Sequence, residues 1–342
     1  MKRKSKLFLA VAGIMTALGV LICLAGYFVS LRSGERILAG SLDNGKGYTE
    51  FFGAAELDKI KLSVDDADIN IIGGSDRPYM EILNFNESLY SFTSNSAMIT
   101  FNQSPDFSSV SGLWESGFSF KGLRYFLFPG TGKGDKVINV YLDSVEKVKS
   151  FDLFSESGNI TLSGVSADSE FNIRIGSGSV SISELSADCT LNIQSETTAS
   201  PVKINMDNTE VSVLRISAPK AEIKASALRA RFCDIEVTGG SADIDYTPIG
   251  DTGCSVEVAT SSKLTVNGDA YEVSSQSPYK YGEEAPDKDK FAAAEGSGDG
   301  EGENTVKKSY LKIKADDLSV DLELHPTEPD PFIGEDNADN NS

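Results

Sequence analysis

The residues in this chain that could carry chemistry are few, and acidic pairs are the most suggestive of them. Asp234 with Glu236, and Asp243 with Asp245, are each two positions apart. That spacing places both carboxylates of a pair on one side of a strand. Two carboxylates flanking a glycosidic bond are what glycoside hydrolysis requires. Alternation alone produces such pairs on any acidic solvent-facing strand, so we interpret them as surface residues.

The other reactive side chains form no constellation in the sequence. The single histidine, His325, stands directly before Pro326, and no Ser-His-Asp or Cys-His arrangement can be assembled around it. The four cysteines lack the spacing of metal ligands. No glycine-rich phosphate loop leads from a strand into a helix. We therefore expect no catalytic, cofactor-binding or metal-binding residues, and a protein that is not an enzyme.

Charge narrows the classes of partner. The 342 residues include 31 Lys and Arg against 51 Asp and Glu, a net charge of −20. A protein that neutralises nucleic-acid phosphates needs a basic face, so nucleic acid is excluded as a partner. Beyond residue 31 the net charge is −24. Such a surface repels anionic lipid headgroups and acidic cell-wall polymers unless divalent cations bridge them.

A segment near the amino terminus predicts a membrane anchor. Leu7 to Leu31 contains no charged side chain and would extend about 37 Å as a helix, enough for a hydrocarbon core of about 30 Å. Residues 1–6 include four basic side chains, so we expect a cytoplasmic tail, an uncleaved single-pass signal anchor over 7–31 and an extracytoplasmic remainder. A cleaved signal peptide and a lipoprotein signal at Cys23 are the alternatives.

Three cysteines, Cys189, Cys233 and Cys254, follow the anchor. An odd number cannot form a complete disulfide framework. We expect them to be small buried apolar residues.

Short strands dominate the pattern beyond a linker at 32–52. Phe171, Ile173 and Ile175 alternate with the polar Asn172 and Arg174, and the same period of two recurs towards residue 324. Period two indicates strands with one buried face. We therefore expect an all-β ectodomain over 53–325, with residues 57–102 as its first cap and 309–324 as its last.

An internal repeat specifies how these strands stack. Residues 157–168 (SGNITLSGVSAD) and 177–188 (SGSVSISELSAD) share six of twelve positions at an offset of 20. A repeat of about 20 residues that holds two short strands is typical of a solenoid. We predict a parallel β-helix, or β-solenoid, of about 20-residue coils; an antiparallel sandwich of hairpins is the competing arrangement. The repeat fades after about residue 205, and the register there stays open.

These motifs resemble a family. The segments LDKIKLSVDDADINIIGG (57–74), KVINVYLD (136–143), SGNITL (157–162), SGSVSI (177–182) and LSVDLEL (318–324) are similar to those of a bacterial strand-repeat domain of unknown function, the putative adhesin family. The resemblance covers roughly residues 50–325. It implies a right-handed parallel β-helix-like fold at a bacterial cell surface and supplies no catalytic residues.

Two excursions interrupt the strand pattern. Residues 103–135 are rich in aromatics and glycines, and long loops of this kind usually carry function. They predict either a lid on the strands or a partner-binding contact made by Trp114, Phe118, Phe120, Tyr125, Phe126 and Phe128. Residues 282–305 form an acidic segment and 326–342 an acidic tail, both expected to be disordered.

The sequence as a whole indicates a non-enzymatic surface protein. We expect it to bind or sense cell-envelope components, with another membrane protein or a cell-wall polymer as partner. A self-assembling envelope scaffold, and hence a homo-oligomer, is the first alternative. A carbohydrate-active β-helix enzyme built on Asp243 and Asp245 is the second.

Overall fold

The computed structural model describes ten stretches of the chain: 48–51, 57–76, 78–85, 90–94, 97–103, 135–143, 148–250, 254–274, 276–282 and 309–329. The described residues fall into two compact units: Tyr48, 82–85, Tyr90 and 135–136 belong to the smaller one, and all the other described residues belong to the larger one. In these ten stretches no helix is long and apolar enough to cross a membrane. The expected anchor at 7–31 lies outside them.

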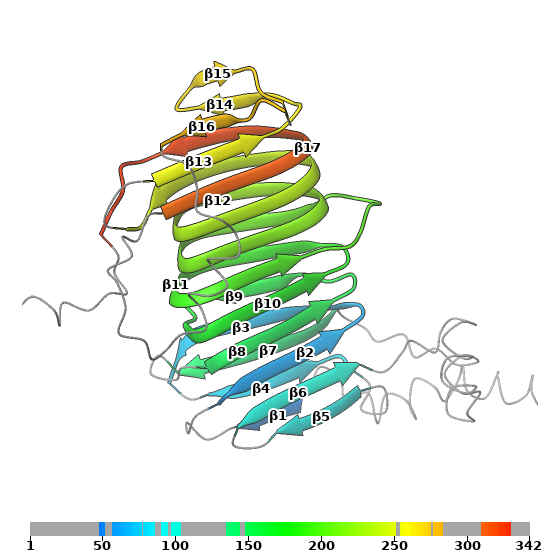
Figure 1. Ribbon diagram of the computed structural model, residues 1–342. Coiled ribbons are helices and arrows are strands. Elements are labelled where there is room, and N and C mark those ends of the chain that lie inside the picture. Colours follow the sequence, from blue (N-terminus) through cyan, green and yellow to red (C-terminus); the bar gives the residue numbers. More distant parts are fainter. Residues whose placement is uncertain are drawn as a thin grey trace, which may run out of the picture. The chain divides into compact units, whose positions relative to one another are not determined.

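All regular structure in the described residues is β, as expected, and it forms one curled 17-stranded sheet (Figure 1). The strands are β1 (Tyr48–Phe51), β2 (Lys59–Val64), β3 (Ala67–Ser75), β4 (Tyr79–Leu83), β5 (Tyr90–Ser94), β6 (Met98–Gln103), β7 (Lys136–Asp143), β8 (Val148–Ser155), β9 (Ile160–Ser163), β10 (Ala167–Ile175), β11 (Ser179–Gln194), β12 (Val202–Pro248), β13 (Cys254–Ala259), β14 (Leu264–Val266), β15 (Asp269–Tyr271), β16 (Tyr279–Tyr281) and β17 (Ser309–Leu324).

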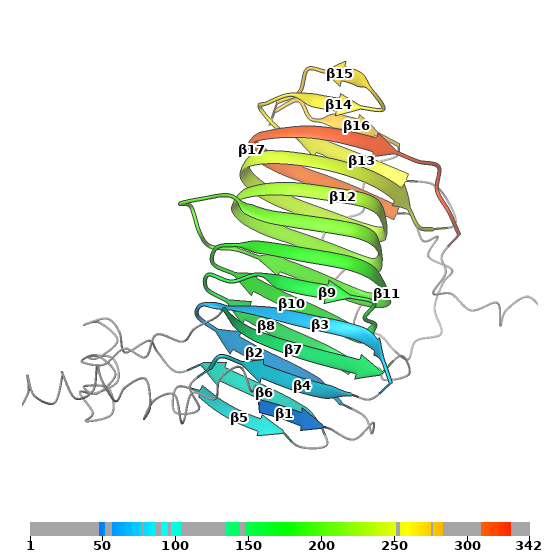
Figure 2. The same ribbon diagram turned by 180° about the vertical axis from the view of Figure 1, so that it is seen from behind.

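Parallel pairing at repeat spacing organises the larger unit. Phe171 of β10 pairs with Phe151 of β8 on one side and Leu191 of β11 on the other, an offset of 20 residues each time. We call the surface formed by β6, β2, β8, β10 and residues 190–194 face A. Face B is formed by β3, β9 and residues 179–183 and 203–207, which also pair in parallel (Figure 2).

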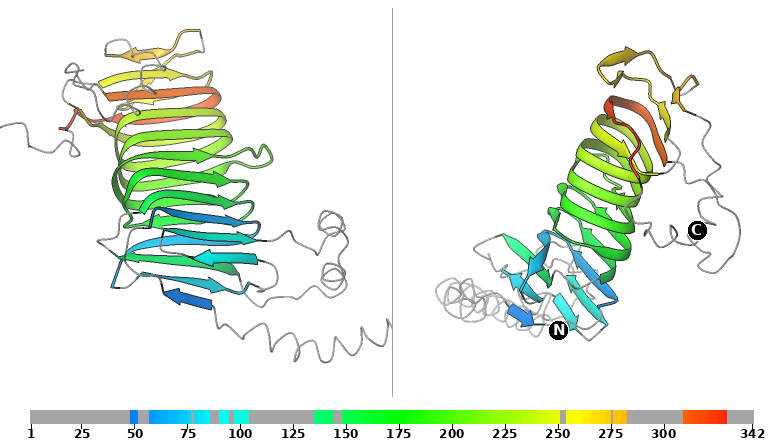
Figure 3. Two further views of the ribbon diagram at one scale, coloured as in Figure 1. Left: turned by 60° about the horizontal axis from the view of Figure 1, so that its bottom comes forward. Right: turned by 90° about the vertical axis from the view of Figure 1, so that its left-hand side faces the viewer.

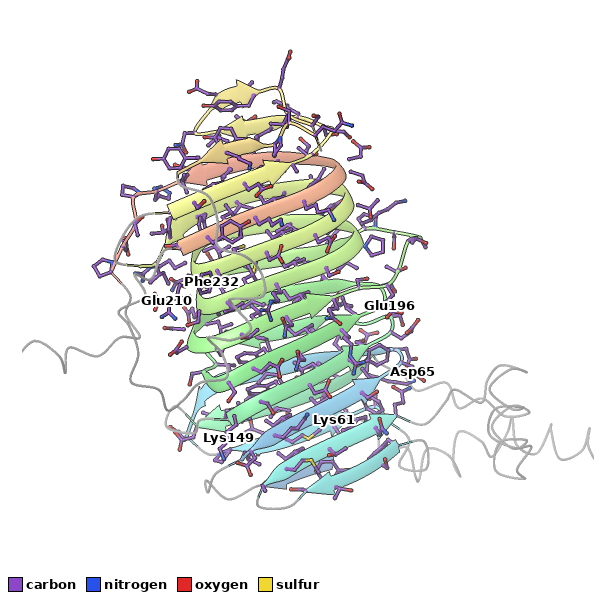
Figure 4. All side chains as sticks on the ribbon, viewed as in Figure 1. Lys61, Asp65, Lys149, Glu196, Glu210 and Phe232 are labelled. Atoms are coloured by element: carbon purple, nitrogen blue, oxygen red, sulfur yellow. The ribbon has the colours of Figure 1, made fainter. Side chains whose placement is uncertain are left out.

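The repeat fades because the offset changes. Val180 pairs with Ile160 at an offset of 20 but with Ile204 at an offset of 24. The additional residues leave the sheet between β11 and β12, around Glu196 (Figure 4). Beyond that point β12 continues as one 47-residue strand that winds through successive turns (Figure 3).

The core lies between the faces and follows the predicted alternation. Phe151, Phe171, Ile173 and Leu191 are all 0% exposed. The Phe151 and Phe171 rings stack with centroids 4.5 Å apart. In-register parallel pairing superimposes like side chains, so each buried position of one strand packs on the equivalent position of the next.

The corners of successive turns superimpose as well. Gly164, Glu184, Asn208 and Ala227 all adopt positive φ, between 47° and 60°. The strand residues just before three of them, Ser163, Ser183 and Asp207, are register partners. The corner therefore requires a left-handed residue whatever the side chain.

Two segments are inserted between turns that are distant in sequence. β2 pairs with both β6 and β8. β17 pairs with β12 on one side and with β13 and β14 on the other. The expectation that residues 309–324 form the last cap is therefore wrong. Within this insertion Lys312 of β17 lies in register between Asp234 of β12 and Glu257 of β13, and opposite charges in register stabilise a pair of strands.

The stack ends beyond β13 and β14 in antiparallel pairs with β16 and β15. Tyr279 and Tyr281 pair with the buried Val258 and Val256, and Tyr271 pairs with the buried Leu264. Register partners point to the same side of a sheet, so the three tyrosines lie over the end of the core. The Tyr271 and Tyr279 rings contact edge to face at 4.7 Å.

Two segments expected to lack structure contain some. β1 lies inside the expected linker at 32–52; its Tyr, Thr and Phe are strand formers. In the expected disordered tail, Glu328 forms a β-bridge with Ile249 and an ion pair with Arg229. These contacts hold the chain as far as residue 329.

Candidate binding faces

The six aromatic residues predicted to bind a partner, Trp114, Phe118, Phe120, Tyr125, Phe126 and Phe128, lie outside the described residues. Their role stays a prediction, as does that of the acidic segment beyond Gly282. The structure instead places two clusters of charged side chains on the outer surfaces of faces A and B.

Face A carries a cationic cluster. Lys61 of β2, Asp152 of β8 and Asn172 of β10 are register partners and form one column across the face. The Asp152 carboxylate has three cations around it: the Arg174 guanidinium at 3.4 Å, the Lys61 amine at 3.7 Å and the Lys59 amine at 3.9 Å. The side chain of Asp152 is 17% exposed, whereas those of the cations are 41–55% exposed. The cluster thus has more positive than negative charge.

A hollow of about 290 Å³ opens beside this cluster. Its lining includes Lys61, Asn102, Asp152, Phe154 and Arg174. The Arg174 guanidinium carbon lies 6.0 Å from the centroid of the Phe154 ring, within range of a cation–π contact. Figure 4 labels Lys61 on β2, with Lys149 on the same side of the sheet. The hollow offers donors, an aromatic surface and an amide to a ligand.

Face B continues through residues 224–226 to Asp243 and Asp245, which line one hollow with residues 181–183 and 205–207. This continuation, counted as face B from here on, carries an acidic cluster that includes one predicted pair. Asp243 and Asp245 of β12 are register partners of Asp321 and Glu323 of β17. The imidazole Nε2 of His325 lies 2.7 Å from a carboxylate oxygen of Asp245. A hollow of about 450 Å³ nearby is lined by Asp207, Lys224, Asp243 and Asp245, among others. Within the described stretches no three His, Cys, Asp or Glu side chains are placed to hold a metal ion.

The other predicted pair, Asp234 and Glu236, lies beside lysines of β17. Glu236 accepts a hydrogen bond of 2.9 Å from the Lys314 amine, and this bond raises the pKa of Lys314. Asp234 lies beside Lys312, which lies beside Glu257, which in turn pairs with Lys280. Alternating charge along this column indicates a structural role for Asp234 and Glu236.

The cysteines largely match the expectation of burial. Cys189 and Cys233 are buried and Cys254 is half-buried, all as free thiols. Burial raises the pKa of Cys189 and of Cys254 to about 12. A thiol with so high a pKa has almost no thiolate near neutral pH, so these residues are poor nucleophiles.

Sequence reasoning missed the cationic cluster. Lys61 and Arg174 are more than a hundred positions apart, and they meet because β2 is inserted beside β8. The one signal in the sequence was Arg174 on the polar side of a predicted strand. The pairing of β2 with β8 was needed to place Lys61 beside it.

No family model matches the chain, and no curated protein does. Solved structures that the chain is similar to include a putative cell adhesion protein from Clostridium sporogenes (12% identity, 82% of this chain, 100% of that chain, TM-score 0.33). A putative adhesin from Bacteroides fragilis (13%, 81%, 97%, 0.40) and a putative lipid binding protein from Parabacteroides distasonis (13%, 82%, 98%, 0.35) are also similar. Likeness at these scores does not define a function for this chain.

Proposed function

We propose that the chain is a membrane-anchored, extracytoplasmic β-solenoid that binds or senses cell-envelope components without enzymatic activity. The parallel, in-register turns at offsets of 20 and 24 residues support the solenoid. Such stacking holds outward side chains in columns at strand spacing, about 4.8 Å. A rigid column of this kind is suited to bind an extended partner.

The observation that carries the binding role is the cationic cluster of face A. In a chain with a net charge of −20, Lys59, Lys61 and Arg174 gather around one carboxylate. Like charges held together cost free energy that a structural role does not require. An anionic partner would offset that cost.

The anchor at 7–31 and a cytoplasmic amino terminus belong to the same proposal. We test them by fusing a reporter that is active only outside the cytoplasm to the carboxyl terminus of the full chain. We expect reporter activity, and retention of the chain in membranes after an alkaline wash. The double variant Val20→Arg, Leu21→Arg should release the chain from the membrane. Release of the unaltered chain, or an inactive reporter, would overturn the anchored topology.

The binding role is tested by photo-crosslinking in living cells. A photoreactive residue replaces Ser63 in the hollow of face A, Trp114 in the aromatic segment, or Gly298 in the acidic segment as the control. We expect adducts from Ser63, from Trp114 or from both, and none from Gly298. Capture of one membrane protein would favour envelope sensing, and capture of polymer would favour direct binding. Equal, nonspecific capture at all three positions would contradict the proposal.

A self-assembling scaffold is the second candidate, and the opposite charges of the two faces favour it. The cationic cluster of face A could meet the acidic cluster of face B on a second copy, since oppositely charged surfaces attract. Sedimentation of the full chain in detergent tests this. Oligomers that dissociate with added salt would support the scaffold, and a monomer at every salt concentration would exclude it.

A further inference from the structure

We propose that the hollow of face A binds the carboxylate of an acidic sugar residue in an extended polysaccharide. This inference rests on the proposed function, because it names the component that the face would bind. It is carried by three properties of the cluster: its excess of positive charge, the aromatic side chain in the lining of its hollow and the polar column that continues from it across the face.

Asp152 leaves part of the cationic cluster open to a second carboxylate. Its carboxylate is contacted by Arg174, Lys61 and Lys59 at 3.4–3.9 Å, each longer than the 2.7–2.9 Å of a well-formed charged hydrogen bond. The two lysines and the arginine are 41–55% exposed and therefore accessible to a ligand. A second carboxylate could take up donors that Asp152 leaves unused, since one guanidinium carries five N–H groups.

Phe154 and the Asn102 amide favour a sugar over a bare anion as the ligand of the hollow. Phe154 lies on the outer side of β8, between the buried Leu153 and Ser155, and large apolar side chains on a solvent face call for an explanation. Its ring and the Asn102 amide line the same hollow as Lys61 and Arg174. A sugar ring presents an apolar face for the aromatic and hydroxyls for the amide, which a bare inorganic anion does not.

The columns explain why an extended chain fits better than a membrane. From Lys61 and Asp152 the column continues through Asn172 to Asn192. The Asn192 amide donates one hydrogen bond of 2.9 Å to Asn172 Oδ1 and one of 3.1 Å to the Glu170 carboxylate. Neutral amides along one line suit the hydroxyls of successive sugars. A lipid surface would instead need several cations spread across a plane, whereas the three cations here gather around one carboxylate.

The experiment measures binding of a galacturonic acid trimer to the full chain in detergent, with its methyl-esterified, uncharged form as the matched ligand. We expect the acidic trimer to bind at least about tenfold tighter and to weaken as salt rises from about 0.05 M to about 0.5 M. Lys61→Gln and Arg174→Gln should each weaken binding severalfold. Lys203→Gln, which removes the same charge from face B, should leave it unchanged.

Asp152→Asn should change the affinity for the acidic trimer in the opposite direction. It removes the internal carboxylate that competes for the cations, so we expect the acidic trimer to bind severalfold tighter, with folding checked by thermal unfolding. Equal binding of both trimers, or no effect of Lys61→Gln, would overturn the inference. So would inorganic phosphate displacing the trimer at equal concentration, or tighter binding to vesicles that contain phosphatidylglycerol. The reporter and alkaline-wash results are independent of all these outcomes, so failure of the sugar site would leave the anchored topology standing.

Discussion

At the scale of single residues, like charges on face B set a cost that one substitution can relieve. Asp243 and Asp321 are exposed register partners on neighbouring strands. We expect Asp321→Asn to raise the free energy of unfolding by about 0.2–1 kcal/mol, because like charges directly opposite destabilise a sheet. Chemical denaturation by urea at low salt measures the gain. Asp269→Asn, which removes an acid paired with Val266, should have no such effect, and a gain that persists undiminished in high salt would contradict the electrostatic cause.

Buried thiol and phenol groups make the free energy of unfolding depend on pH in the alkaline range. Burial raises the pKa of Cys189 and of Tyr310 to about 12 and that of Tyr246 well above 10. Their stabilising effect is complete below the pKa of the unfolded chain and is lost as pH rises towards the folded pKa. Between about pH 9 and pH 12, Cys189 alone should lower the free energy of unfolding by about 1.4 kcal/mol per pH unit. Urea titrations across this range measure the slope of the free energy of unfolding against pH. Cys189→Ala should reduce this slope by the contribution of one titrating group.

At the scale of elements, two glycines at the corners allow the cost of backbone strain to be compared with the cost of close packing. Gly178 has φ +119°, and a Cβ there would lie 2.2 Å from the carbonyl oxygen of Gly158. Gly74 also has positive φ, +79°, yet a Cβ would meet nothing within 4 Å. We expect Gly74→Ala to cost about 1–2 kcal/mol and Gly178→Ala to cost clearly more, because neighbouring turns must separate. Thermal and urea unfolding rank the two variants, and equal costs would show that the turns do not pack at that corner.

The strands were predictable from sequence, but the neighbours of two of them were not. The alternation at Phe171, Ile173 and Ile175 fixes which side of a strand is buried, and the structure confirms it. Most core positions hold an interchangeable Ile, Val, Leu or Phe, so the alternation does not say which strands pair. The SGNITL and SGSVSI repeat supplied the register of β9 with β11, but β2 and β17 carry no copy of that offset. The cationic cluster depends on β2 and could not be foreseen for the same reason.

Insertion of β17 makes a prediction about a cleaved chain. A specific protease site introduced between Gly282 and Ser309 would separate β17 from β16 covalently. We expect the two fragments to co-elute, because β17 pairs with β12, β13 and β14 at once. Val320 is 1% exposed, so Val320→Asp should release the carboxyl-terminal fragment after cleavage. Size-exclusion chromatography distinguishes the outcomes, and separation of the unsubstituted fragments would show that β17 contributes little.

At the scale of the whole molecule, repetition implies that turns can be removed as units. Ile160 and Val180 are register partners, and so are Phe171 and Leu191. Deletion of Ile160–Ser179 joins Asn159 to Val180, which would place β11 against β3 and β8 in the register that β9 and β10 now occupy. Because each turn of a solenoid contacts only its neighbours, we expect this chain to fold and unfold cooperatively with reduced stability.

Half a turn should not be removable. Deletion of Ile160–Ser169 joins a corner of face B to β10 of face A, so the chain would enter the wrong face and its buried side chains would lose their partners. Circular dichroism during thermal unfolding, together with proteolysis, compares the two deletions. Cooperative unfolding of the 20-residue deletion alone would support the solenoid. Equal tolerance of both deletions would mean that in-register stacking is not what stabilises the sheet, and the columns of face A would lose their structural basis.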